Sequence, residues 1–101
     1  MIKHLVMWKL RDFAEGATKE QNAQKMKTDL EALKQTIPQI RHLEVGANFL
    51  PSDFSYDVAL YSEFATEEDL ALYQKHPDHL SAGAFVQKVS ESRVVVDYKT
   101  E

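Results

Sequence analysis

Hydrophobic and polar residues alternate along this chain with two different periods. Four segments alternate at every residue, which is the period of a β-strand, and they cover residues 2–10, 40–49, 55–64 and 92–99. Two segments repeat their apolar residues every three or four positions, which is the period of a helix, and they cover residues 18–36 and 66–89. The predicted order of elements is therefore β-α-β-β-α-β.

Start and stop signals mark the first helical segment. Thr18 and Gln21 fit a capping box, in which Thr18 is the N-cap. Pro38 ends this helix, because proline cannot donate the next backbone hydrogen bond. Residues 11–17, before the cap, are expected to form a loop.

The second helical segment starts clearly and is then interrupted. Thr66 is followed by three acidic residues, which is typical of a first helical turn. The His-Pro-Asp-His sequence at residues 76–79 interrupts the helix. Asp78 is expected to cap the continuation, whose buried stripe ends at Val89.

The order of elements is typical of the ferredoxin-like α+β fold, a four-stranded antiparallel sheet with its helices on one face. The opposite face of such a sheet is bare in a monomer. Yet in the first strand Leu5 and Met7 oppose Val6 and Trp8, so both faces are apolar. Because large exposed apolar patches are rare, a second copy should cover this face as a homodimer, a dimeric α/β barrel.

Composition supports one small globular domain over residues 1–101, and it excludes some classes of binding partner. The net charge of −4 has no basic cluster, which argues against a nucleic-acid surface. The chain has no cysteine, which excludes disulfides and thiolate zinc sites. No secretory pattern or membrane-length apolar stretch occurs, so we expect a cytoplasmic protein without membrane contact.

Two pairs of residues are candidates for a site. His4 and Asp97 are expected at the same end of adjacent first and last strands, where the carboxylate would fix the imidazole tautomer. The alternative is a purely structural hydrogen bond that satisfies a buried histidine. Which face of the sheet they occupy depends on a strand register that the pattern leaves open.

The second pair is His79 and Tyr73. Beyond the helix break, His79 could act as a base toward a proton next to a carbonyl, and Tyr73 could donate to the carbonyl oxygen. The alternative places His79 as a packing residue at a helix end and Tyr73 in the core. The spacing of His76 and His79 would also suit a metal pair, but a third ligand is not evident.

Four short motifs in order resemble the stress-responsive dimeric α/β-barrel family. They begin the first strand, fill the third strand, surround the histidine-rich break and close the last strand, at residues 2–6, 56–64, 73–79 and 94–98. The resemblance implies a barrel of two subunits with helices outside. One plant member of this family is a polyketide cyclase that performs an aldol condensation without metal or cofactor.

The resemblance also implies a set of catalytic residues. His79 and Tyr73 correspond to the histidine and tyrosine at the reacting centre of that cyclase, and His4 and Asp97 to two further residues that line its site. It implies no cofactor and no metal. Apart from the resemblance, the aromatic residues would fill the core or the dimer interface, or line an apolar pocket; they are Trp8, Phe64, Phe85 and Tyr61.

Three functions remain open at this point. The first is a pocket for a small apolar or aromatic molecule, with cyclase- or isomerase-like His/Tyr acid–base chemistry. The second is a non-catalytic stress-response or interaction protein whose dimer is structural. The third, by analogy of fold alone, is a cofactor-free monooxygenase.

Overall fold

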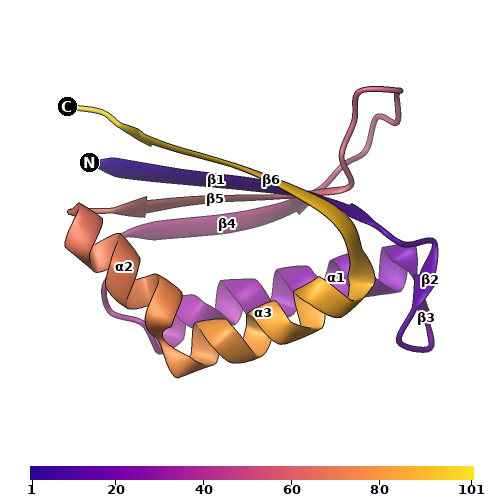
Figure 1. Ribbon diagram of the computed structural model, residues 1–101, viewed down its shortest axis with the longest axis horizontal. Coiled ribbons are helices and arrows are strands. Elements are labelled where there is room, and N and C mark those ends of the chain that lie inside the picture. The colour runs from indigo at the N-terminus through magenta and orange to yellow at the C-terminus, as the bar shows by residue number, and fades with distance from the viewer.

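The computed structural model describes residues 1–101 and has one main antiparallel sheet. Its strands lie in the order β4-β5-β1-β6, with β1 between β5 and β6 (Figure 1). The strand bounds are Ile2–Leu10 for β1, His42–Ala47 for β4, Val58–Phe64 for β5 and Ser90–Lys99 for β6. This topology confirms the ferredoxin-like α+β fold.

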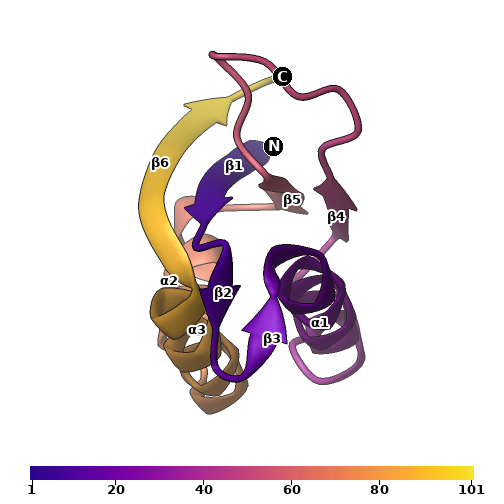
Figure 2. The same ribbon diagram turned by 90° about the vertical axis from the view of Figure 1, so that its right-hand side faces the viewer.

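All the helices cover one face of this sheet (Figures 1 and 2). Their bounds are Lys19–Glu31 for α1, Ala32–Gln35 for the short 3-10 helix η1, Glu67–Lys75 for α2 and Pro77–Val89 for α3. Thr18 and Thr66 cap α1 and α2 as predicted, because each side chain accepts a hydrogen bond from the third residue of its helix. No helix is both long enough and apolar enough to span a membrane.

The core lies between the sheet and the helices. Along β1 the even-numbered residues are buried, whereas the odd-numbered ones between them are partly exposed or exposed. Val6 and Trp8 on β1 pack in one apolar cluster with Met26 and Leu30 of α1 and Val86 of α3. The period of two in β1 therefore assigns its even-numbered residues to the helix-covered face.

Three local predictions were wrong. The 11–17 segment is not an open loop but a small hairpin of β2 (Phe13–Ala14) and β3 (Ala17–Thr18). Its two turn residues, Glu15 and Gly16, both have positive φ, as a tight turn that follows the strand twist requires. The two middle strands, β4 and β5, are shorter than the predicted 40–49 and 55–64. The cap of α3 is the ring of His76 and not Asp78, because the ring accepts a hydrogen bond from the backbone N–H of Asp78.

The face of the sheet away from the helices is bare. It carries an apolar group that we call the open-face patch, made of Met7, Val94, Val96 and Tyr98, which are 37–53% exposed. The loop between β4 and β5, residues 48–57, rises on the same side as this face (Figures 1 and 2). Phe49 and Phe54 of this loop are 90% and 93% exposed.

Candidate functional site

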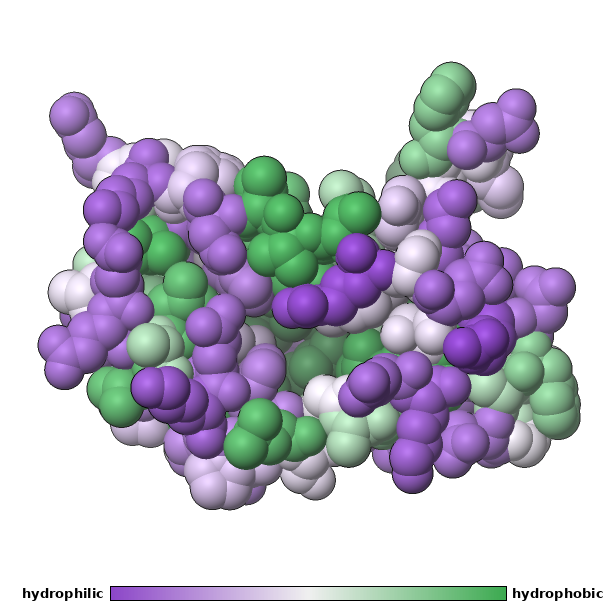
Figure 3. All heavy atoms as spheres, viewed as in Figure 1, coloured by the Kyte–Doolittle hydropathy of each residue, from purple (hydrophilic) through white to green (hydrophobic).

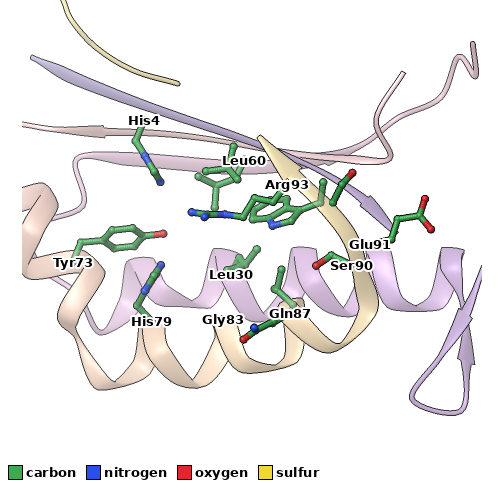
Figure 4. A pocket seen from close by; sticks show the side chains of 14 residues that line it. His4, Leu30, Leu60, Tyr73, His79, Gly83, Gln87, Ser90, Glu91 and Arg93 are labelled. Carbon is green, nitrogen blue, oxygen red and sulfur yellow. The ribbon is translucent and has the colours of Figure 1, made fainter. Parts of the chain in front are cut away.

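A cavity of about 480 Å³ lies between the sheet and α3. Its mouth is visible as a hollow below β6 in the space-filling view (Figure 3), and its lining is drawn in Figure 4. The wall combines apolar side chains with a few ionisable ones, and comprises His4, Val6, Trp8, Leu30, Leu60, Tyr73, His79, Gly83, Val86, Gln87, Ser90, Glu91, Ser92 and Arg93. This mixture and size are usual for a small-molecule pocket.

His4 and Asp97 form a hydrogen-bonded pair at one end of the cavity. They lie directly opposite each other in the β1–β6 ladder, and His4 is buried on the helix-covered face. The Asp97 carboxylate accepts from Nδ1 of His4. An ionised carboxylate can only accept, so Nδ1 of His4 carries the proton of this hydrogen bond.

Tyr73 comes from the last turns of α2 and is only 1% exposed. Its ring lies between the two histidine rings, with centroid distances of 6.3 Å to His4 and 4.5 Å to His79. Burial raises the pKa of Tyr73 to about 12, partly offset by the positive charge of Arg93. The phenol therefore stays protonated at neutral pH and can donate a hydrogen bond into the cavity (Figure 4).

His79 is the third residue of α3, and its ring points toward Tyr73 (Figure 4). Burial lowers the pKa of His79, the charges of His4 and Arg93 act in the same direction, and the backbone of Gln74 opposes them. The Nδ1 atom of His79 is buried without a hydrogen bond of good geometry. Buried polar atoms are nearly always paired, so this exception singles out His79.

The inference from sequence missed Arg93. Arg93 lies on β6, opposite Trp8 of β1. It comes two residues before Val95 and shares the face of β6 that also holds Asp97. Its guanidinium reaches into the cavity toward His4 and Tyr73 (Figure 4). The signal was present, because residues 93, 95 and 97 share one face of any regular strand.

The four candidate residues from the sequence converge at one end of the molecule. His4, Tyr73 and His79 line the cavity, and Asp97 holds His4 from the neighbouring strand. His76, the possible metal partner of His79, caps α3 instead, and no group of three or more His, Cys, Asp or Glu side chains could hold a metal ion. The site is therefore a set of rings around a space that both apolar and polar side chains line.

Solved structures with the same fold cover nearly the whole chain. A dimeric protein of unknown function from Bacteroides fragilis is 37% identical over 98% of this chain and 95% of that one, with a TM-score of 0.84. A dimeric ferredoxin-like protein of unknown function from Thermobifida fusca is 25% identical over 98% and 90%, with a TM-score of 0.83. A hydroxynitrile lyase from Passiflora edulis is 16% identical over 99% and 93%, with a TM-score of 0.82, a likeness of fold alone.

The sequence also matches a known protein family over nearly its whole length. No curated protein matches the chain. The model of the stress responsive A/B barrel domain matches residues 2–100, which is nearly the entire sequence. The chain therefore belongs to the stress-responsive α/β-barrel family.

Proposed function

We propose that the cavity binds a small apolar or aromatic carbonyl compound and transfers a proton next to its carbonyl group without a cofactor. The observation that carries this proposal is the His79 ring on the cavity wall, packed 4.5 Å from the ring of Tyr73, with burial lowering the pKa of the imidazole. A neutral imidazole is a base, and an un-ionised phenol is a hydrogen-bond donor. The two are thus in complementary states at neutral pH.

The proposed step uses each ring once. His79 removes a proton from the carbon beside the carbonyl, and the Tyr73 hydroxyl donates to the oxygen as negative charge develops there. The resulting enolate either attacks a second carbonyl of the same molecule, as in a cyclase, or takes the proton back at another carbon, as in an isomerase. His79 returns its proton to the new alkoxide or carbon, so protons balance.

His4 and Asp97 have a supporting place in this proposal. Asp97 holds the Nδ1 proton of His4, so that Nε2 accepts a hydrogen bond from the substrate. Asp97 therefore acts through His4 as a positioning residue. The hydroxynitrile lyase of Passiflora edulis shares the fold, so this architecture is compatible with an enzyme.

We also infer that two copies pair through the open-face patch. The open-face patch lies on the same side of the sheet as the 48–57 loop, which carries Phe49 and Phe54. In a monomer these apolar side chains would be exposed to water, which is unfavourable. The related proteins of Bacteroides fragilis and Thermobifida fusca are dimeric. This pairing also favours the second candidate function, a non-catalytic stress-response or interaction protein built on the dimer.

Proton exchange separates the two functions. Deuterium uptake beside the carbonyl can be followed by NMR in D₂O for aryl ketones such as propiophenone and β-keto esters such as ethyl benzoylacetate. We expect the protein to accelerate uptake in at least one of them. His79→Gln and Tyr73→Phe should each lower that rate about 100- to 1,000-fold.

Gly83 offers a way to close the cavity without touching these rings. It lies on the cavity wall within α3, and a Cβ there meets no atom within 4 Å. We expect Gly83→Leu to fill the cavity and abolish exchange, while Ala84→Leu on the exposed side of the same helix leaves exchange unchanged. Folded protein without acceleration of any ketone would favour the non-catalytic function instead.

A further inference from the structure

The cavity holds one side chain that the proposed proton transfer does not use. Arg93 projects from β6 into the space between His4 and Tyr73 (Figure 4). The one carboxylate on the cavity wall, Glu91, points away from it in the same view. The Asp97 carboxylate on the same strand is already bound to His4.

The Arg93 guanidinium, on an exposed residue that lines the cavity, therefore brings a positive charge to the side of the reacting rings. His79 is neutral there, because burial lowers its pKa, and Tyr73 is un-ionised. The Arg93 guanidinium keeps its positive charge beside these rings, whereas the Asp97 carboxylate is held by its hydrogen bond to His4. A planar guanidinium binds a carboxylate through two parallel hydrogen bonds, a geometry that lysine cannot reproduce.

We propose that Arg93 selects ligands that carry one carboxylate on a small apolar or aromatic body. The apolar wall formed by Val6, Leu60 and Val86 takes the body, and Arg93 holds the anionic end beside Tyr73. A single cation matches a monoanion. This assignment rests on the proposed function, since it names the class of molecule that occupies the same cavity.

Matched acids and esters test this assignment by binding alone. The probes are benzoate, 4-butylbenzoate and 2-naphthoate, each beside its methyl ester. Binding is followed by the NMR signal of the Trp8 indole, because Trp8 lines the cavity and is the single tryptophan of the chain. We expect at least one acid to bind about 10-fold or more tightly than its ester.

Variants assign the preference to one side chain. Arg93→Gln should weaken binding of the acid about 10- to 100-fold and leave the ester within about 2-fold. Arg93→Lys should fall between, because it keeps the charge and loses the paired hydrogen bonds. Arg41→Gln is the matched control, since Arg41 is exposed and lies outside the cavity lining.

Two results would overturn the assignment of Arg93. One leaves the proposed small-molecule site standing, and the other refutes that site as well. Equal binding of acid and ester, or equal weakening of both by Arg93→Gln, refutes the carboxylate preference while the cavity remains a binding site. No binding of any acid or ester to a folded protein refutes the small-molecule site itself, and the carboxylate preference with it.

Discussion

His79 is half-buried, and because burial favours its neutral form, the folded protein loses stability in acid. In the unfolded chain its pKa returns to the ordinary value of 6.5, whereas burial in the folded state lowers it. As the pH falls below about 6.5, the unfolded chain therefore takes up the proton first, and stability is lost until the pH passes the folded pKa. Above 6.5 this residue adds no dependence on pH.

We expect the free energy of unfolding, from urea titrations between pH 8 and pH 5, to fall in that acid window. A single proton gives a slope of at most about 1.4 kcal/mol per pH unit. His79→Gln should flatten this slope, because the uptake of that proton disappears. An unchanged slope in the variant would mean that the ring is not buried as a neutral group.

The residue types of the candidate site could be predicted from the sequence, whereas their arrangement around one cavity could not. His4, Asp97, Tyr73 and His79 were candidates because residue type and a family motif both pointed to them. That they share a cavity depends on the register of β1 against β6, which local alternation does not encode. Arg93 was missed although it shares a face of its strand with Asp97, because an arginine on an edge strand is ordinarily a solvated charge.

At the scale of elements, the break between α2 and α3 positions the site. His76 ends α2 and caps α3 with its ring, and Pro77 occupies the first turn, where its missing N–H costs nothing. Together they fix where α3 begins. His79, in the first turn of α3, therefore points inward rather than along the surface (Figure 4).

We expect His76→Ala to lower the free energy of unfolding by about 1 kcal/mol, because the cap on the backbone of Asp78 is lost. The NMR signal of the His79 ring should shift as the first turn of α3 loosens. His76→Asn should restore most of both, since asparagine is a good N-cap. If the shift of the His79 signal persists in His76→Asn, packing of the His76 imidazole holds His79 in place, and the capping hydrogen bond does not.

Element types followed from the hydrophobic period, whereas some boundaries did not. The strands predicted over 40–49 and 55–64 are the shorter β4 and β5. Apolar residues such as Phe49 extend the strand pattern into a loop where the monomer gives them no cover. Patterns of burial that depend on another chain look the same in sequence as patterns that depend on the chain's own core.

At the scale of the whole molecule, the proposed dimer predicts opposite results for two neighbouring valines. Val96 belongs to the open-face patch, whereas Val95 lies opposite Val6 on the helix-covered side, and both are partly exposed. We expect Val96→Lys to weaken association about 100-fold or more, because an apolar contact would have to desolvate a charge. Val95→Lys is the matched control.

Sedimentation velocity over a range of protein concentrations measures this association. A monomer for Val96→Lys and a dimer for Val95→Lys would place the contact on the open face. The reverse result would move the contact to the helix side and contradict the proposed pairing.

The alternation of β1 has a consequence for how this sequence can change. Even-numbered residues such as His4 face the cavity, and odd-numbered ones such as Met7 face the other way. Point substitutions can therefore alter the cavity and the open-face patch separately. Deletion of one residue after Leu5, such as Met7, would move the preceding residues of the strand by one register position, turning the His4 imidazole outward and Leu5 inward. Such a deletion would disable both at once, so lineages should diverge here by substitution and keep the length of β1.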